Sequence, residues 1–186
     1  LVSTLHAGLT RLVTGNPEPQ PDLAHHWQID DRGLRWRFFL RSQLRWHNGE
    51  PLTGHQLLQT LEKLQRHPRS QPSLANVANI SLPHPLCIQF DLQLPDYWLA
   101  HRLAELPCLM THPELPAIGA GPFKLTLNEP QLVRLEQHAG YHLQHPYLDT
   151  IEYWITPDLP TAGADASCQH PVRITIGQQD DLAQAR

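Results

Sequence analysis

The sequence predicts a mixed α/β fold of the α+β kind, because the two-residue period of strands and the longer period of helices both recur along the chain. In residues 34–41, apolar side chains alternate with mostly basic ones, which indicates a strand buried on one face. After a tight Asn-Gly turn at residues 48–49, Thr53 and Gln56 have the spacing of a capping box that opens a helix. We expect this strand, turn and capped helix to be the unit against which the other elements pack.

The segment before this unit contains one expected helix and one expected strand. In residues 1–13 the leucines recur at helical spacing, and Gly8 would allow a neighbouring element to approach closely. Residues 15–21 are rich in Gly, Asn and Pro and are expected to form a loop. Residues 24–29 fit a short strand, which residues 30–33 join to the next strand as a hairpin.

The central helix is expected to end at the His-Pro pair of residues 67–68, and a polar loop follows at 69–72. Residues 75–82 and 86–94 then alternate as two strands joined by a Pro-His-Pro connection. Where strand and helix meet, the expected core consists of Trp36, Phe38, Leu57 and Leu61.

A second helix is expected from a cap at Asp96 through Leu106, followed by a short apolar strand at residues 109–110. A turn with two glycines then leads into a hairpin of residues 123–127 and 132–137.

The C-terminal part contains two further expected strands, at residues 147–156 and 172–176. Between them, residues 157–171 have the Pro, Ala, Gly, Asp and Ser composition of a linker. We expect the partners of the last strand to lie beyond residue 186.

The composition is that of ordinary globular material. The chain has 186 residues, of which 40% are hydrophobic and 17% charged, enough for one sizeable core. The formal net charge of −4 argues against binding along a DNA duplex, and no apolar run approaches the roughly 20 residues of a transmembrane helix. The three cysteines, expected to be thiols as in a reducing compartment, are Cys87, Cys108 and Cys168. A start at Leu1 without a signal peptide suggests a piece of a longer protein.

Few residues point to catalysis or to a cofactor. The hydrolase, zinc-protease and nucleotide-binding motifs are missing, so we expect no enzymatic activity and no cofactor. His138, His142 and His145 lie in an expected loop, where solvated or hydrogen-bonded rings are a better interpretation than a metal site. A group of arginines lies at positions 32, 35, 37, 41 and 45. They could bind an anion such as a phosphate, or they could form the solvent-exposed face of a half-buried strand, which is the interpretation we favour.

Three segments, in order, resemble the extracellular solute-binding proteins of the oligopeptide, dipeptide and nickel class. They are HHWQIDDRGLRWRFFLRSQLRWHNGEPLTGHQLLQTL at residues 25–61, GAGPFKL at 119–125 and YHLQHPYLDTIEYWITPD at 141–158. Members share a W-x-F-x-L-R strand, a turn that opens a helix, a G-T-G-P-[YF] hairpin start and a Y…P-x-L-D-x-I strand. Ala120 replaces the usual threonine, and a linker follows Asp158 where exported members continue into a helix.

Within that class, the sequence of residues 25–41 is similar to that of the C-terminal domain of SgrR-type transcriptional regulators, which are associated with sugar-phosphate stress. The resemblance implies a type II periplasmic-binding-protein-like fold of two lobes, of which this chain is a fragment. It would comprise lobe I at residues 1–157, a linker at 158–171 and the incomplete start of lobe II at 172–186.

The same resemblance implies a small-molecule-sensing effector domain that binds a sugar phosphate or a peptide-like ligand. DNA would be contacted only through an N-terminal domain outside this chain. The protein would act in the cytoplasm and would not bind a membrane. The alternative is the periplasmic or extracellular substrate-binding component of an ABC transporter for peptides or nickel. The candidate ligand contacts of lobe I are Arg69, Ser73 and Asn76, in a loop that could equally be merely solvated.

Overall fold

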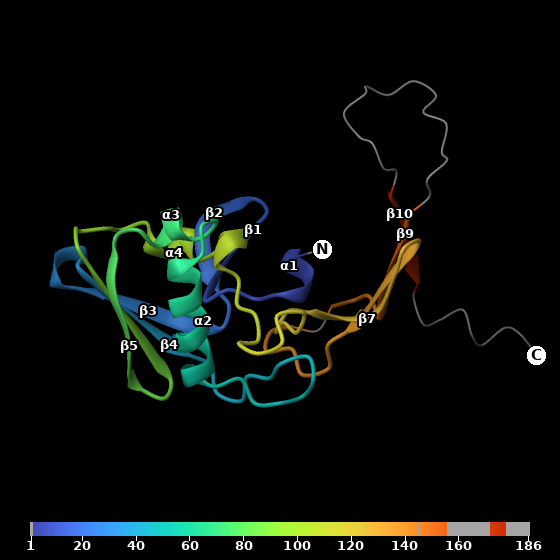
Figure 1. Ribbon diagram of the computed structural model, residues 1–186, viewed down its shortest axis with the longest axis horizontal. Coiled ribbons are helices and arrows are strands. Elements are labelled where there is room, and N and C mark those ends of the chain that lie inside the picture. Colours follow the sequence, from blue (N-terminus) through green and yellow to red (C-terminus); the bar gives the residue numbers. More distant parts are fainter. Residues whose placement is uncertain (1, 145, 156–171, 178–186) are drawn as a thin grey trace, which may run out of the picture.

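The computed structural model describes residues 2–144, 146–155 and 172–177, in which two antiparallel four-stranded sheets, a hairpin and short helices are arranged side by side (Figure 1). The helices are α1 (Val2–Leu5), α2 (Gly54–Arg66), α3 (Gln71–Leu74) and α4 (Leu99–Arg102), with 3₁₀ turns at Asp31–Gly33 and Leu106–Cys108. The strands are β1 (Thr10–Val13), β2 (Asn16–Pro21), β3 (Ala24–Asp30), β4 (Arg35–Leu40), β5 (Val77–His84), β6 (Cys87–Leu92), β7 (Phe123–Glu129), β8 (Leu132–Gln137), β9 (Thr150–Ile155) and β10 (Val172–Gly177). The mixed α and β content confirms the predicted fold class.

The first sheet has the strand order β3-β4-β6-β5, and one of its faces carries the main core. Side chains of β4 alternate between buried and half-buried, as the sequence predicts. Helix α2 packs against β5 and β6 and buries Leu57 and Leu61. With Trp36 and Phe38 also at most 1% exposed, the predicted core is confirmed.

Helix α2 begins where its sequence signals place it. The Thr53 Oγ1 accepts a bond from the Gln56 backbone N–H (3.4 Å), and the Thr53 N–H donates to Gln56 Oε1 (3.0 Å). This is the predicted capping box. The helix ends at Arg66, directly before the His-Pro pair, also as predicted. Within the described residues, no helix has the length and apolar character to cross a membrane.

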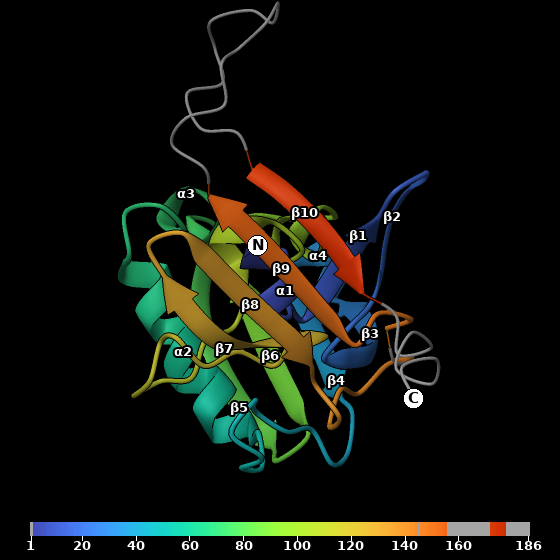
Figure 2. The same cartoon turned by 90° about the vertical axis from the view of Figure 1, so that its right-hand side faces the viewer.

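The second sheet, in the order β10-β9-β8-β7, stands beside the first and is seen face-on in Figure 2. Among the residues whose burial the structure describes, its own core is small: Leu5, Phe123 and Leu135 are buried there, and other apolar side chains pack around them only partly buried. Strand β10 pairs with β9 along its whole length, from Val172 opposite Ile155 to Gly177 opposite Thr150. The expectation that its partner lies beyond residue 186 is therefore wrong.

Two glycines allow the second sheet to join the N-terminal segment. The Gly121 N–H donates to the Leu5 carbonyl (2.9 Å) directly after α1. A Cβ atom at Gly119 would lie 1.9 Å from the same carbonyl oxygen, and one at Gly121 would lie 2.6 Å from Thr4 O. Only glycine therefore lets the turn before β7 lie against the end of α1.

The N-terminal expectation is wrong beyond Leu5. Helix α1 ends there, and residues 10–13 form β1 in a hairpin with β2. The leucine spacing fits a helix, but long-range pairing prevails: the Leu23 and Ala24 N–H groups donate to the carbonyls of Gly8 and Leu9. A backbone oxygen of Leu103 lies 2.9 Å from where a Gly8 Cβ would be, so the predicted close approach is confirmed.

The loop expected at residues 15–21 is mostly strand β2, a strand with prolines at positions 17, 19 and 21. Its only partner among the described strands is β1, and prolines are tolerated in such an edge strand. The polar loop expected at 69–72 gives way to α3 from Gln71, and the strand expected from residue 147 begins only at Thr150.

The second helix is shorter than expected. Helix α4 has a single turn, Leu99–Arg102, and its first residues follow Trp98 rather than an Asp96 cap. Asp96 Oδ1 does accept the Trp98 N–H (2.8 Å), so this carboxylate lies near the helix start. The Thr10 hydroxyl donates to the Ala100 carbonyl (2.6 Å), a group that a longer helix would use internally. Residues 109–110 form only an isolated bridge between Met110 and Ala7.

Candidate ligand-binding face

The predicted ligand contacts lie within residues 69–76, which include α3 and are held against α4 and the residues that follow it. The Ser73 hydroxyl donates to Glu105 Oε2 (3.0 Å), and Arg102 Nε donates to the Ser73 carbonyl (2.9 Å). Arg102 is itself paired with Asp96. Ser73 is half-buried, and its environment is therefore set by residues about 30 positions later in the chain.

Asn76, at the end of the same segment, has a structural role. Its Nδ2 donates to the Leu94 carbonyl (2.8 Å), and its Oδ1 accepts the Leu94 N–H (2.9 Å). One N–H of Nδ2 and one lone pair of Oδ1 remain for another partner, so a ligand could bind the Asn76 amide without breaking these bonds. Arg69 differs, because it is exposed and forms no ion pair within the described residues. The three predicted residues lie within residues 69–76, with Ser73 on α3, and form no hydrogen bonds with one another. Their role in binding stays a prediction.

A cavity of about 240 Å³ is lined by none of the three predicted residues, but residues on either side of a Ser73 partner contribute to it. Ala104 and Leu106, which flank the Ser73 partner Glu105, form part of its wall. The N-terminal segment contributes Ser3 of α1, Arg11 of β1, and His6 and Asp22, which directly follow α1 and β2. Known small-molecule pockets span about 300–1,000 Å³, so this cavity has the size of part of a site.

Polar groups at this cavity are organised around a buried carboxylate. Asp22 is 4% exposed, and its Oδ2 accepts the Gly8 N–H (3.0 Å). His142 Nε2 donates to Asp22 Oδ1 at 2.8 Å; this nitrogen carries the proton because an ionised carboxylate only accepts. Burial, and then the charge of Asp22, raises the pKa of Tyr141 to about 12. The Tyr141 hydroxyl is therefore a hydrogen-bond donor at neutral pH.

His6 adds an unused nitrogen near the same cavity. Its Nδ1 is buried and has no hydrogen-bond partner in the described part of the chain. Burial lowers the pKa of His6, so its ring is neutral at neutral pH. Sequence reasoning missed His6, Arg11, Asp22 and Tyr141, and it considered His142 only as a solvated or hydrogen-bonded ring. No local signal joins Asp22 to His142, since 120 positions separate them.

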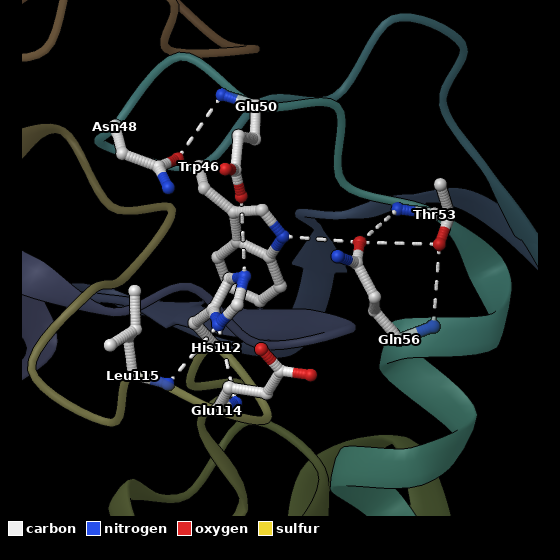
Figure 3. A network of polar contacts seen from close by, with 8 residues as sticks. All are labelled: Trp46, Asn48, Glu50, Thr53, Gln56, His112, Glu114 and Leu115. Carbon is white, nitrogen blue, oxygen red and sulfur yellow. Dashed lines mark hydrogen bonds and ion pairs between the residues drawn. The ribbon is translucent and has the colours of Figure 1, made fainter.

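A second polar network fixes the start of α2 (Figure 3). Trp46 Nε1 donates to Gln56 Oε1 (3.2 Å), the same oxygen that accepts the Thr53 N–H. Trp46 is fully buried, so this bond satisfies the indole N–H inside the core. The capping residue Gln56 thus also holds the segment before the helix.

His112 connects this network to a later loop (Figure 3). Its Nδ1 accepts the N–H groups of Glu114 and Leu115, both at 3.2 Å. Because Nδ1 accepts, the ring N–H is on Nε2, which faces Glu50 Oε2 at 3.5 Å. Apart from His112 Nε2, which is buried and has no hydrogen-bond partner in the described part of the chain, the polar atoms of this network bond to one another, and the network offers no nucleophile.

The histidines do not form a metal site in the part of the chain that the structure describes, where no three potential ligand side chains meet. His47 Nε2 (3.2 Å) and His138 Nδ1 (3.1 Å) both face the Gly121 carbonyl. His138 and His142 are hydrogen-bonded and largely buried. Of the two expected situations, a solvated ring or a hydrogen-bonded ring, the second is therefore observed for both. His145 lies outside the described residues, and the absence of a bound metal stays a prediction.

The sequence is similar to a known family and to several curated proteins. A profile described as bacterial extracellular solute-binding proteins, family 5 middle, matches residues 18–183. The uncharacterized protein YbaE of Escherichia coli K12 is 47% identical, over 98% of this chain and 32% of its own length. The HTH-type transcriptional regulator SgrR of Pectobacterium atrosepticum is 31% identical, over 84% of this chain and 29% of its own. The chain thus spans about a third of the length of these relatives.

Solved structures show the same fold. NikA from Brucella suis in complex with Fe(III)-EDTA superposes with a TM-score of 0.77 at 21% identity, over 84% of this chain and 34% of NikA. The periplasmic binding protein AgaA from Agrobacterium tumefaciens R10, in complex with agropinic acid, gives 0.74 at 21% identity, over 84% of this chain and 35% of AgaA. These similarities confirm the expectation of a fragment with a type II periplasmic-binding-protein-like fold.

Proposed function

The chain belongs to the bacterial extracellular solute-binding proteins of family 5, and from this membership we propose that it is the small-molecule-sensing effector domain of a transcriptional regulator. The observation that carries the proposal is the 31% identity to an HTH-type transcriptional regulator over 84% of this chain. DNA would be contacted through an N-terminal domain outside residues 1–186, which agrees with the net charge of −4 here. Such a protein would act in the cytoplasm.

In this proposal, residues 1–157 are lobe I, 158–171 a linker and 172–186 the start of lobe II. A small ligand, either a sugar phosphate or a peptide-like molecule, would bind between the lobes. Strand β10, at the start of the segment assigned to lobe II, pairs with β9, at the end of the segment assigned to lobe I, so the two segments would share the second sheet. Movement of lobe II would therefore act directly on the edge of the second sheet.

Lobe I would supply one wall of the ligand site through Arg69, Ser73 and Asn76. The adjacent cavity adds Arg11 and the donor hydroxyl of Tyr141. Both arginines are exposed, and a guanidinium binds phosphate and carboxylate groups with two parallel hydrogen bonds. A cavity of about 240 Å³ is too small to enclose such a ligand, so the second lobe is needed to complete the site.

Ligand binding would regulate transcription without a chemical step. A ligand that contacts both lobes stabilises the closed state by as much as its affinity differs between the closed and open states. Hinge closure would then change the position of the attached DNA-binding domain. The proposed function therefore requires binding and movement only, consistent with a non-enzymatic protein.

The test is a ligand titration of the intact protein. Calorimetry with glucose 6-phosphate and with short peptides should identify a ligand class, and that ligand should change the affinity for the promoter DNA of the regulator. Replacing Arg69 by Gln should weaken ligand binding about tenfold, because a charge-assisted bond is lost. Arg66→Gln, which changes an exposed arginine on α2, is the matched control and should leave the affinity unchanged.

Two results would contradict the proposal. One is DNA binding that stays the same at saturating ligand. The other is an intact protein that binds no DNA at all.

A second candidate function is the substrate-binding component of an ABC transporter for peptides or nickel. The observation that favours it is the fold shared with NikA and with a dipeptide-binding protein from Pseudoalteromonas, the latter with a TM-score of 0.73. Cell fractionation separates the two: a transporter component is recovered from the periplasm or the cell surface, and a regulator from the cytoplasm. The sequence upstream of residue 1 gives the same answer through a winged helix-turn-helix or a signal peptide.

A further inference from the structure

A second and larger cavity, of about 630 Å³, adjoins the cavity of the candidate ligand-binding face, since Tyr141 lines both. It is formed by the loop after β4, through residues 41–45, and by residues 139–142 after β8. Its polar side chains include Arg41, Arg45 and Tyr141. In volume it falls within the range of small-molecule sites.

The charge of this groove is one-sided. No Asp or Glu is among its lining residues, whereas both Arg41 and Arg45 are. The preceding arginines of the same stretch are neutralised: Arg35 is paired with Asp31 and Asp91, and Arg37 with Asp30. Arg35 and Arg37 therefore belong to the solvent-exposed face of a half-buried strand, which is the explanation favoured by the alternation of apolar and basic residues.

Arg41 and Arg45 have no such partners within the described residues. Arg41 Nε donates to the Asp22 carbonyl (2.8 Å), and Arg45 Nη1 donates to the Gly49 carbonyl (2.7 Å). Each guanidinium has five N–H donors, so most donors of both remain available for another acceptor. The nearby Asp22 carboxylate is already engaged by Gly8 and His142.

The groove is built by specific backbone features. Gln43, in the middle of the loop, has a φ of 62°, a left-handed conformation that is unfavourable for a residue with a side chain. Across the groove, a Cβ atom at Gly140 would lie 3.4 Å from Arg45 Cδ, so the backbone there packs on the Arg45 side chain. The second feature places the aliphatic part of the Arg45 side chain against residue 140.

An apolar cavity of about 510 Å³ continues the groove and shares His25, Leu40 and Leu86 with it. Its other lining residues include Phe39 and Pro83, on the outer face of the first sheet. A positively charged region therefore borders directly on an apolar one.

We infer that this groove binds a small organic anion, with its phosphate or carboxylate group at Arg41 and Arg45 and its apolar part against Phe39, Pro83 and Leu86. Arginine pairs with both oxyanions in the same two-bond geometry, so the chemistry is shared. The inference does not depend on the regulator function. The site differs from the candidate ligand-binding face, although Tyr141 lines both cavities.

The experiment is a titration of the intact protein with phenyl phosphate, phenylacetate and inorganic phosphate. We expect saturable binding of phenyl phosphate or phenylacetate, and the tighter of the two identifies the preferred oxyanion. Inorganic phosphate should bind less tightly than phenyl phosphate, because it lacks the part that contacts the apolar surface.

Variants locate the binding. Arg45→Gln should weaken binding of the tighter phenyl compound about tenfold, since one charge-assisted pair is lost. Arg66→Gln is the control for a loss of surface charge, and Arg11→Gln tests the candidate ligand-binding face. Neither should change the affinity. Ser42→Glu, at an exposed position in the groove, adds a repelling carboxylate without touching either arginine and should also weaken binding.

Three results would overturn the inference. The first is that neither phenyl compound binds saturably. The second is equal weakening by Arg45→Gln and Arg66→Gln, which would indicate unspecific attraction to charge. The third is loss of binding in Arg11→Gln but not in Arg45→Gln, which would assign the anion to the ligand site of the proposed function instead. Thermal unfolding of each variant verifies that it is folded.

Discussion

Trp36 connects strand β4 to the core through packing and through a polar bond. Its ring is 1% exposed and stacks on Phe38 with a centroid distance of 5.8 Å, and its Nε1 donates to the Asp96 carbonyl at 2.9 Å. We expect Trp36→Ala to lower the free energy of unfolding by about 3–5 kcal/mol, the usual effect of emptying such a site. Denaturant unfolding measures it.

Trp154, which is 40% exposed, provides the control for Trp36. Its replacement by alanine should lower the free energy of unfolding by much less. Equal effects at both positions would mean that Trp36 does not contribute to the core as described.

His47 predicts sensitivity of the fold to acid. Burial lowers its pKa to about 4 in the folded state, against about 6.5 in an unfolded chain. Between these values the unfolded state binds more protons, so stability is full above pH 6.5 and decreases as the pH falls toward 4. The pKa of His138, whose ring is T-shaped to His47, is lowered by burial in the same direction.

The measurement is the melting temperature between pH 7 and pH 4.5. In His47→Gln the melting temperature should decrease less over this interval than in the unchanged protein. His55→Gln, at an exposed position on α2, should keep the full decrease. An identical pH dependence in all three proteins would contradict the assignment.

At the scale of single residues, the sequence predicts burial better than it predicts partners. The alternation in β4 is enough to identify Trp36 and Phe38 as core residues, because burial on a strand follows its period. The bonds of Asn76 to Leu94 and of His142 to Asp22 depend on which loops meet in space. Nothing local encodes them, and the candidate site was for this reason only partly predictable.

Among the elements, helix α2 has the clearest local determinants. The capping box at Thr53 satisfies backbone N–H groups that the first turn would otherwise leave without partners. We expect Thr53→Ala to lower the free energy of unfolding by about 1 kcal/mol. Thr14→Ala, at an exposed position in the turn between β1 and β2, should have almost no effect in the same chemical denaturation.

Elements with strong signals at both ends were predictable, and those that depend on distant pairing were not. For α2, a capping box and a His-Pro stop bound an amphipathic stripe, and all three signals agree. Residues 9–13 have helical leucine spacing, but the strand next to them contributes backbone bonds that a helix could not receive. Similarly, the partner of β10 was missed because it lies before the linker-like segment rather than after it.

For the whole molecule, the cysteines provide a test of compactness. Cys87 and Cys108 are buried, unpaired thiols, and Cys168 lies outside the described residues. Burial raises the pKa of both, that of Cys108 to about 11 with a further contribution from Glu105, so neither thiolate forms readily at neutral pH. We expect a thiol reagent to modify Cys87 and Cys108 slowly in the native protein. After denaturation without reductant it should count three thiols, and a count of one would reveal a disulfide.

The family and fold follow from motifs spread along the sequence, whereas the division into lobe I, linker and lobe II stays a prediction at its boundaries. Sequence motifs identify which fold a chain adopts because many positions contribute to them together. A boundary depends on a few residues in a segment of low information, such as 157–171.

The small core of the second sheet has a consequence for local unfolding. Among the residues whose burial the structure describes, only Leu5, Phe123 and Leu135 are buried there, so opening strands β7 to β9 exposes far less apolar surface than opening the first sheet. Amide hydrogens of β8 and β9 should therefore exchange with solvent through a sub-global opening of low free energy, whereas those of β4 and β6 should exchange only on complete unfolding. Native-state hydrogen exchange at increasing denaturant separates these two events, and a single exchange behaviour for all four strands would show that the sheets unfold as one cooperative unit.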